Sequence, residues 1–322
     1  MATSLTSKGL VAVSDKTIIA ARESIELVKL FVTDFTAKPE AKYQKVRVNV
    51  LKGAIGDFTV GTNNYTTGTA GEVNYADIAL EKDEISKWAF TDKDFMEDEF
   101  NPEWGTLGPA SGRKIAKNFV TNAIGKLTYT AAGTAGQLSM AASVGALTFA
   151  DFVSAWAKVN AKGYDPAECV VVLEPTAYAQ LKLVADYKTT GISSLNIAQS
   201  LGALLGFKAV ICAPNVSKYS ASGVQNGFGF VVPENALGIV NRVKKAAKDG
   251  GNLLEYGETI DDETGLAVST RVVANTGDGE YVWSMECLHG AALMKQTITV
   301  GDTTKDNGAP GILQLIVTPS AS

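Results

Sequence analysis

Histidine and cysteine are scarce in this chain, and their scarcity excludes several kinds of chemistry. One histidine, His289, is present among 322 residues, so sites that need two imidazoles, such as histidine-rich zinc sites, cannot form. The three cysteines, Cys169, Cys212 and Cys287, lie too far apart in sequence for a zinc knuckle or a disulfide framework. We expect them to be buried small hydrophobic residues in a reducing compartment, and we expect no metal and no cofactor.

Net charge and long apolar runs are limited as well. The 29 basic and 34 acidic side chains give a formal net charge of −5, which argues against a basic clamp for nucleic acid. The longest weakly polar stretch, residues 138–150, is too short to cross a bilayer, and the N-terminus lacks a basic region followed by an apolar one. The sequence therefore predicts a cytosolic protein with no cleaved leader and no membrane partner.

Lysine and arginine are absent from residues 53–81, and the centre of this segment, residues 61–71, is almost entirely Gly, Thr and Asn. Such a segment cannot form a core. Apolar residues alternate with polar ones on both sides of the centre: Phe58, Val60, Val73 and Tyr75. This pattern predicts a long hairpin. Because an isolated two-stranded ribbon is marginally stable in water, we expect it to lean on another copy or a partner. The alternative is a surface loop of a β-rich domain.

Two elements are predicted before the hairpin. Apolar residues recur at three- and four-residue steps through residues 15–35, with Ser14 and Asp15 as capping candidates, and this spacing predicts an amphipathic helix. Residues 43–51 alternate strictly between apolar and polar, which predicts a half-buried strand.

An acidic cluster and a basic cluster follow the hairpin. After a predicted strand at 85–90, the acidic residues are Asp92, Asp94, Glu97, Asp98 and Glu99. A helix is predicted to begin after Pro109, and it carries Arg113, Lys114 and Lys117. The functional interpretation makes the two clusters complementary patches on neighbouring subunits. The alternative is that they are two solvated faces of one subunit.

The rest of the chain divides into an α/β centre and a β-rich end. In the centre, helices are predicted at 148–158, from Pro175 and at 195–205, and buried strands at 169–173, 207–212 and 228–232. Four strands of an antiparallel meander are predicted at 253–260, 266–274, 280–288 and 291–300. The turn between the last two is predicted at His289-Gly290.

No motif in the sequence identifies a reaction. His289 could act as the base for Ser284 with Asp261 or Asp262 as the acid, but the sequence has no Gly-x-Ser-x-Gly elbow. Residues 108–114 lack the spacing of a phosphate-binding loop, and Gly227-Phe-Gly229 lacks the third glycine of a dinucleotide fingerprint. We therefore expect no catalytic residue, and an α/β enzyme that uses His289 remains a lesser alternative.

The order of elements resembles the major capsid proteins of tailed bacteriophages, which have the Hong Kong 97 fold. Residues 46–51 and the hairpin at 58–75 resemble the arm and extended loop of that family, and residues 78–80 and 85–90 its return into the peripheral domain. The helix after Pro109 stands where the family has its long spine helix. Residues 170–181 and 201–214 are similar to the axial-domain pattern of strand, proline, helix, glycine, strand and proline.

The resemblance covers residues 43–300 and implies an α+β fold, a Hong Kong 97-like capsid fold with an inserted α/β axial domain. The implied parts are an N-terminal arm (1–52), an extended β-hairpin loop (53–82), a peripheral domain with a long spine helix (83–130 and 250–300), an axial domain (131–249) and a C-terminal tail (301–322).

The implied function is a structural subunit that self-assembles into the icosahedral head of a tailed virus around its double-stranded DNA. Its implied partners are further copies of itself in hexamers and pentamers, a portal protein, a separate scaffolding protein and decoration proteins. Packaged DNA would be contacted without sequence specificity. The implied location is the virion, with assembly in the host cytoplasm.

Two departures from the family limit these implications. Some family members crosslink through a loop lysine, but residues 53–81 contain no lysine, so we expect no crosslink of that kind. Other members carry a long scaffolding segment at the N-terminus. Here the first clear strand begins near residue 43, which leaves space for one helix, so we expect a separate scaffolding protein or none.

The predicted contacts between subunits come from three regions. The loop tip contributes Asn63, Asn64, Tyr65, Thr66 and Thr67. The acidic cluster is expected to face the basic cluster of a neighbour, and the helix at 15–35 is expected to clasp an adjacent copy. Two alternatives to a virus head are an encapsulin, which is a cellular compartment with an enzyme cargo, and a β-rich tail or surface adhesin.

Overall fold

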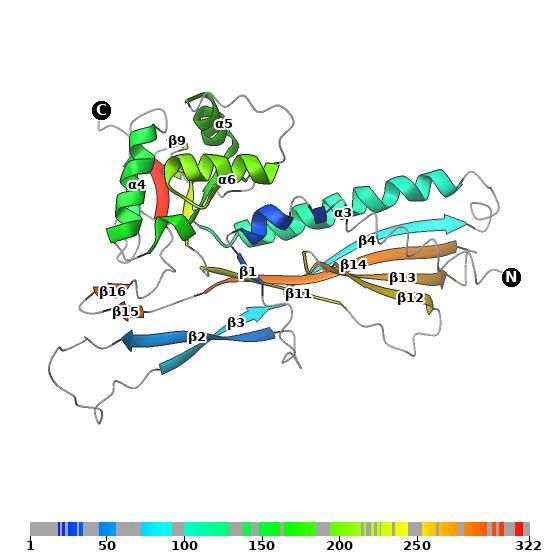
Figure 1. Cartoon of the computed structure of the whole chain (residues 1–322). Helices are drawn as coiled ribbons and strands as arrows, with labels where there is room; N and C mark the ends of the chain where they lie inside the picture. Colours follow the sequence, from blue (N-terminus) through cyan, green and yellow to red (C-terminus); the bar gives the residue numbers. More distant parts are fainter. Residues whose placement is uncertain are drawn as a thin grey trace.

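The computed structural model describes residues 19, 21–22, 25–30, 32–34, 45–55, 72–91, 100–128, 138–142, 148–161, 164–184, 194–213, 216, 220–221, 224–225, 227–233, 236–243, 253–261, 264–275, 280–294, 298–300, 303–305 and 313–317. These residues form three parts (Figure 1): a long helix lying along a sheet, an α/β unit at one end of that sheet, and a β-ribbon below the sheet.

After a helical N-terminal segment, whose described helical residues are 19, 21–22 and 25–29, the helices are α3 (Phe100–Ile124), α4 (Phe149–Ala161), α5 (Pro175–Val184) and α6 (Ser194–Leu205), with a 3-10 turn at Pro166–Glu168. The strands up to residue 212 are β1 (Val32–Asp34), β2 (Lys45–Ile55), β3 (Glu72–Ala79), β4 (Lys82–Thr91), β5 (Leu138–Ala142), β6 (Val170–Leu173) and β7 (Ala209–Cys212). The strands that follow are β8 (Ser220–Ala221), β9 (Val224–Gln225), β10 (Gly227–Val232), β11 (Leu237–Arg242), β12 (Leu253–Ile260), β13 (Ala267–Asn275), β14 (Glu280–Leu293), β15 (Ile298–Val300), β16 (Thr303–Lys305) and β17 (Leu313–Val317).

The peripheral sheet, made of β1, β4 and β11–β14, is organised around the long strand β14. β4 pairs along one edge of β14, whereas β13 and β11 share the other edge, β13 opposite residues 280–286 and β11 opposite residues 288–293. The buried amide of Asn241 joins the two, because it accepts from Ala267 N–H at 3.2 Å and donates to Cys287 Sγ at 3.2 Å. The predicted turn at His289-Gly290 is therefore wrong, since β14 continues through it to pair with β11.

One face of the peripheral sheet is covered by α3 (Figure 1). The predicted apolar stripe of this helix is confirmed for Ile115, Phe119 and Ala123, which are buried in the core between helix and sheet; Leu127 is buried there as well but lies past the end of the helix. The predicted start is wrong, because α3 begins at Phe100 and Pro109 lies inside it. A proline removes one backbone hydrogen bond from a helix interior, and a helix of 25 residues that packs on a sheet retains most of the others.

The N-terminal helix packs on the same core. Residues 21–22 and 25–29 are helical, and Ala21, Ile25 and Val28 are buried against residues of α3 and the peripheral sheet. Its apolar face is thus occupied within the subunit, and the expectation that the helix at 15–35 clasps an adjacent copy stays a prediction. The predicted extent to residue 35 is wrong, because residues 32–34 form β1, parallel to β11. The β-branched pair Val32-Thr33 favours a strand over another helical turn.

The axial sheet has the strand order β5-β17-β10-β6-β7. Alternate residues of its strands enter two different cores: Val170 and Val172 of β6 face the core shared with α3, whereas Val171 and Leu173 face the core under α4, α5 and α6. The prediction that Val170–Leu173 is a fully buried strand is confirmed. β6 and β7 are parallel and are connected through α5 and α6.

Local signals set the ends of the axial helices. The backbone N–H of Thr148 donates to the Asp151 carboxylate at 2.7 Å. This hydrogen bond caps the start of α4, as in a capping box. The Glu174 carboxylate accepts from Ala177 N–H at 2.9 Å in the first turn of α5, which begins at Pro175 as predicted. Gly206, with φ of 77°, ends α6 in the left-handed conformation that glycine adopts without strain.

The ribbon consists of β2 and β3, paired antiparallel from Lys45↔Ala79 to Lys52↔Glu72. Of the predicted hairpin, the second arm is seen paired: Val73 and Tyr75 pair with Leu51 and Asn49 of β2, the strand that precedes the hairpin. The end of β2 pairs parallel with β15, which in turn pairs with β16. Residues 56–71, including the predicted loop tip, lie outside the described part of the chain.

Two strands differ from the predicted domain boundaries. β11 falls within the range predicted for the axial domain, but it pairs with β14 and β1 of the peripheral sheet. β17 falls in the predicted C-terminal tail, but it pairs with β5 and β10 of the axial sheet. The other boundaries stay predictions.

Candidate assembly surfaces

The base of the ribbon contacts the peripheral sheet at Gly290 of β14. A β-carbon at Gly290 would lie 1.9 Å from the Ala79 carbonyl oxygen, so the end of β3 crosses β14 at a distance that no other residue allows. On either side of this crossing, Ile78 and Leu80 pack with Val240 and Met294 in a small separate core. The base of the ribbon is therefore fixed by close backbone contact and apolar packing to its own subunit, and the strands extend away from it (Figure 1).

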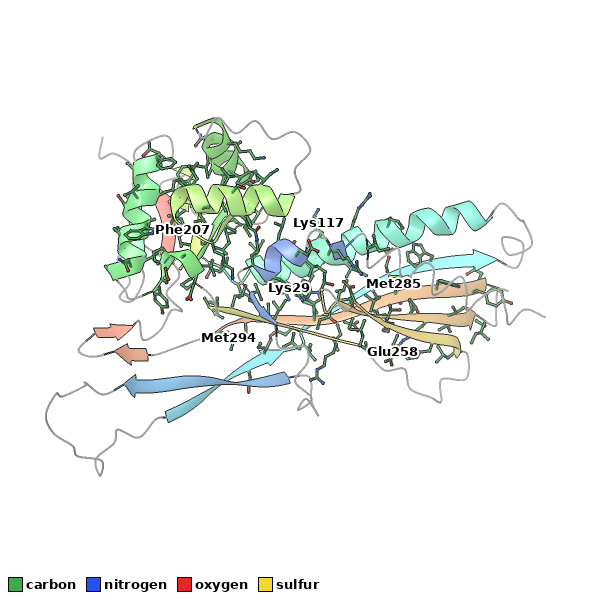
Figure 2. All side chains as sticks on the ribbon, viewed as in Figure 1. Lys29, Lys117, Phe207, Glu258, Met285 and Met294 are labelled. Carbon is green, nitrogen blue, oxygen red and sulfur yellow. The ribbon has the colours of Figure 1, made fainter. Side chains whose placement is uncertain are left out.

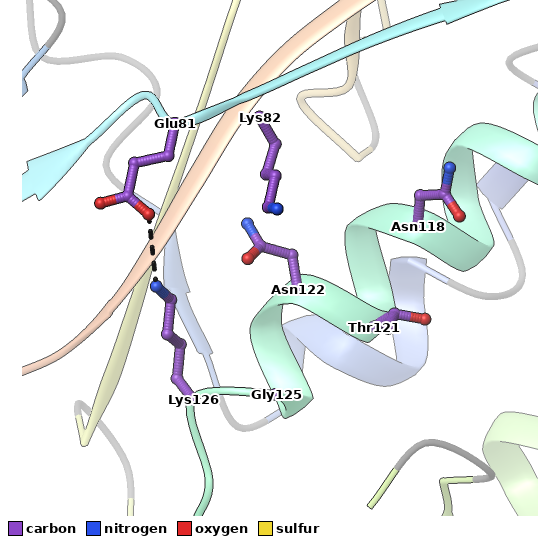
Figure 3. A pocket seen from close by; sticks show the side chains of 7 residues that line it. All are labelled: Glu81, Lys82, Asn118, Thr121, Asn122, Gly125 and Lys126. Carbon is purple, nitrogen blue, oxygen red and sulfur yellow. Dashed lines mark ion pairs between the residues drawn. The ribbon is translucent and has the colours of Figure 1, made fainter.

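A polar pocket of about 470 Å³ lies between the corner that joins β3 to β4 and the end of α3 (Figure 3). Glu81 and Lys82 come from the corner and Asn122 from α3, and the Lys126 ammonium lies 3.6 Å from the Glu81 carboxylate across the opening. Sequence reasoning did not find these residues, because their pattern carries no recognisable signal. The ion pair ties the corner at the ribbon base to the end of the long helix.

His289 lies behind this pocket and is 1% exposed. Its Nδ1 is 3.2 Å from the Asn122 side-chain nitrogen, and its ring is 5.1 Å from the ring of Phe119. Ser284 lies five residues earlier on β14, so the two side chains point to opposite faces of the sheet, roughly 17 Å apart along the strand. The proposed catalytic use of His289 with Ser284 therefore fails on geometry, and the imidazole instead packs between sheet and helix.

Asp261, the suggested acid of that arrangement, has a structural role. Its carboxylate accepts from the Arg22 guanidinium at 2.9 Å and from the backbone N–H of Thr264 at 3.2 Å, and it is also bonded to the Thr264 hydroxyl. Burial alone raises the pKa of this carboxyl, but the hydrogen bonds from Thr264 and Arg22 outweigh it, so the pKa lies below its ordinary value. The contact attaches the N-terminal helix to the turn between β12 and β13. Asp262 lies outside the described residues.

The predicted basic cluster lies on the surface of α3. Arg113, Lys114 and Lys117 are exposed, and Figure 2 shows Lys117 on the side of the helix away from the labelled Met285 of the sheet. The predicted acidic partners, at residues 92–99, and the predicted loop tip, Asn63 to Thr67, lie outside the residues that the structure describes. The pairing of basic and acidic clusters across subunits therefore stays a prediction.

The face of the peripheral sheet away from α3 carries polar side chains on its central strands. Arg271 of β13 and Glu286 of β14 form an ion pair at 3.0 Å, with side-chain exposures of 20% and 7%. The Arg271 guanidinium also lies 5.9 Å from the centre of the Tyr256 ring, within reach of a cation–π contact. The ion pair and the cation–π contact therefore stabilise this face in addition to side-chain packing.

The cysteines are buried at two of the three positions. Cys169 and Cys287 are buried as predicted, but the prediction is wrong for Cys212, which is exposed at the end of β7, and none of the three forms a disulfide. Burial, with the nearby carboxylates of Asp165 and Glu168, raises the pKa of the Cys169 thiol to about 12. The uncharged thiol behaves as a small apolar side chain.

Within the described ranges, no three His, Cys, Asp or Glu side chains gather as a metal ion would require. Over the same part of the chain, no helix combines the length and the apolar content needed to span a bilayer.

Comparison with known proteins identifies the fold. No protein-family model matches the sequence, and no curated protein matches it. Solved structures do match. The capsid of a native gene transfer agent (GTA) particle has 13% sequence identity and a TM-score of 0.53, covering 92% of this chain and 91% of that chain. The capsid of an empty GTA particle has 12% identity and a TM-score of 0.51, covering 92% and 90%.

The capsid of Ralstonia phage GP4 is similar as well, with 9% identity, a TM-score of 0.52, and coverage of 90% of this chain and 88% of that chain. Structural similarity at such low sequence identity establishes the architecture but not the function. In each case about nine-tenths of both chains is matched, so the likeness extends over most of the fold and is not confined to one of its parts. The chain therefore has the Hong Kong 97-like capsid fold that the sequence resemblance predicted.

Proposed function

We propose that this chain is the structural subunit of an icosahedral shell, the head of a tailed virus that encloses double-stranded DNA. The observation that carries the proposal is the match of the complete fold, over about nine-tenths of both chains, to subunits of the GP4 and GTA capsids. Ser284 and His289 lie on opposite faces of one strand, which argues against the enzyme alternative that pairs these two side chains. The role is structural.

The chemistry of such a role is the burial of many modest interfaces. Each contact between neighbouring copies can be weak, because a closed shell makes every copy multivalent and raises the overall affinity without new contacts. A ribbon fixed at Gly290 and extending from the body suits this purpose, since a two-stranded ribbon gains stability when it lies on another surface.

The proposed partners are further copies in hexamers and pentamers, with a portal protein, a separate scaffolding protein and decoration proteins. Packaged DNA is contacted without sequence specificity, and the location is the virion after assembly in the host cytoplasm. Neighbouring genes for a terminase and a portal protein would support this assignment over a cellular compartment, whose neighbour would be a gene for an enzyme cargo.

The first test is deletion of residues 61–71, which contain the proposed contact residues Asn63, Asn64, Tyr65, Thr66 and Thr67. We expect a folded, soluble subunit that no longer assembles, because the paired part of the ribbon, Lys45–Lys52 with Glu72–Ala79, remains. Circular dichroism measures the fold, and negative-stain microscopy measures the shells. Normal shells from the deletion variant would show that the loop tip is not an assembly contact.

The second test concerns the charge clusters. Reversal of Arg113 and Lys114 to glutamate should impair assembly and make the remaining assembly less dependent on salt, since screening acts on exposed pairs. The acidic partners proposed for these side chains are Asp92, Asp94, Glu97, Asp98 and Glu99 of a neighbour, with Lys117 as the third cation. Unchanged assembly at low ionic strength would remove this pairing from the proposal.

A further inference from the structure

The exposed face of α4 carries no charge. Eight of its residues are exposed, and all are apolar or neutral: Phe149, Ala150, Val153, Ser154, Trp156, Ala157, Asn160 and Ala161. The two charged residues of the helix lie elsewhere, since Asp151 is buried at the first turn and Lys158 is half-buried. A surface helix ordinarily directs charged and polar side chains to solvent, so this face is unusual for one that stays in water.

Large apolar side chains run along this face. Phe149, Val153 and Trp156 are exposed by 39%, 58% and 40%, at steps of four and three residues that place them on one stripe. The core side of the same helix has its own stripe, Phe152, Ala155 and Val159, which is fully buried. The outer stripe is therefore additional to the one that folding of the subunit requires.

The stripe continues onto the end of α6. A β-carbon at Gly206 would lie 3.2 Å from the Trp156 ring, so the turn that ends α6 adjoins this tryptophan. Leu204, in that last helical turn, is 51% exposed, and the whole of α6 contains no charged residue. Together these four side chains are half of the eight large apolar side chains exposed in the described part of the chain. We name the stripe of Phe149, Val153 and Trp156, with Leu204 in the adjoining turn of α6, the α4 surface.

We propose that the α4 surface is a contact between axial units, covered by a second copy of this chain in the assembled shell. The proposal rests on the proposed function. A partner of strong charge is disfavoured, because no charged residue on this surface would compensate the charge it buries.

The size of the surface also favours a copy held within a larger assembly. A helix of 13 residues is about 20 Å long and about 10 Å across, so its outer face has a footprint of roughly 200 Å². A stable isolated pair of proteins buries about 800 Å² on each partner. The α4 surface alone is too small to hold a dimer, but it can contribute to a neighbour that is also held by other contacts.

The test compares two substitutions at equally exposed apolar positions. Val153→Lys changes the α4 surface at a side chain 58% exposed, whereas Leu254→Lys changes β12 of the peripheral sheet at a side chain 57% exposed. Both variants should keep the melting temperature of the unassembled subunit, because substitutions at exposed sites have small effects on folding. Only Val153→Lys should reduce the yield of sedimenting particles, by about tenfold or more. Equal particle yields from the two variants would overturn the proposal.

A second measurement separates this proposal from the proposed function. A benzophenone amino acid at position 153, or at position 254 as the control, is irradiated in the purified chain at high concentration. A covalent dimer from position 153 and not from 254 supports the α4 surface even where the chain forms no shells, in which case the proposed function fails by itself. No dimer from position 153, in particles or at high concentration, would overturn the proposal.

Discussion

The axial and peripheral sheets bury their strands in different ways. The axial strand β6 is buried at every position, because its alternate side chains enter two cores. The peripheral strand β14 directs Trp283 and Met285 to the core under α3, while Glu286 on the other face is held in an ion pair with Arg271. A strand that is apolar throughout therefore marks a sheet with an apolar core on each face, and a strand that alternates marks a sheet with an apolar core on one face and buried polar side chains on the other.

The difference extends to the surfaces that remain for neighbours. The exposed surface of the axial unit includes an uncharged helix, α4, whereas the exposed side of the peripheral unit's α3 carries Arg113, Lys114 and Lys117. Contacts through the α4 surface should depend little on salt, and contacts through the α3 cations should weaken as salt rises. The four tests below examine the comparison within a single subunit.

The largest effect is expected in the axial sheet. Phe230 of β10 is fully buried and faces the core shared with α3, so Phe230→Ala should lower the free energy of unfolding by about 3–5 kcal/mol. Urea denaturation of the unassembled subunit, followed by circular dichroism, measures this loss. A loss below about 1 kcal/mol would show that the axial sheet is not packed on both faces.

A smaller effect is expected in the peripheral sheet. Glu286→Ala should cost about 1–3 kcal/mol, because it leaves the largely buried Arg271 without its carboxylate. Replacement of both residues, Arg271→Met with Glu286→Leu, should recover most of that loss, since an apolar pair fills the space without a charge to desolvate. If the double variant is as unstable as Glu286→Ala, an apolar pair cannot replace the ion pair on this face. The peripheral sheet would then differ from the axial sheet more strongly than we expect.

The contact between the ribbon base and β14 is tested by Gly290→Ala. A new methyl group would overlap the Ala79 carbonyl oxygen, so β3 must move from β14, at a cost of about 1–3 kcal/mol. We expect reduced particle yield together with this loss. Gly257→Ala is the matched control, because its β-carbon would meet only the Thr270 hydroxyl at 2.9 Å, and that side chain can rotate. Equal effects from the two variants would contradict the role of Gly290.

The smallest effect is expected at Asp261, and it depends on pH. Because the folded-state pKa lies below the ordinary value, the carboxylate stabilises the fold above about pH 4, where it is also ionised in the unfolded chain. This contribution is lost as the pH falls through the folded pKa. Asp261→Asn should therefore be less stable than the original chain by about 1 kcal/mol at pH 7, with the gap closing below pH 4. Urea denaturation at pH 7 and at pH 3 measures the gap, and a pH-independent gap would contradict this explanation.

Periodicity in the sequence was sufficient for most elements. The strict alternation at 45–51 and the continuous apolar run at 170–173 predicted β2 and β6, and Glu174-Pro175 marked the first turn of α5. The fold followed from the order of these elements, and the comparisons confirm it. Such signals are local, since they depend on residues a few positions apart.

The missed features depend on contacts between distant residues. The register of β2 with β3, the passage of β14 through His289-Gly290 and the burial of the N-terminal helix are each decided by a partner far away in sequence. Gly290 resembled a turn residue, but it is a glycine because β3 crosses it. The candidate contact residues could be proposed from charge and composition alone, and those at 63–67 and 92–99 fall outside the described part of the chain.

Each of the three larger sheets joins an early strand to a late one: β4 to β14, β2 to β15 and β5 to β17. None of these sheets can close until the ribosome has synthesised nearly all of the chain, so the ribbon has no completed base while translation continues. The subunit should therefore acquire its capacity to join neighbours only after release, which protects a growing chain from premature association with copies made on the same messenger RNA.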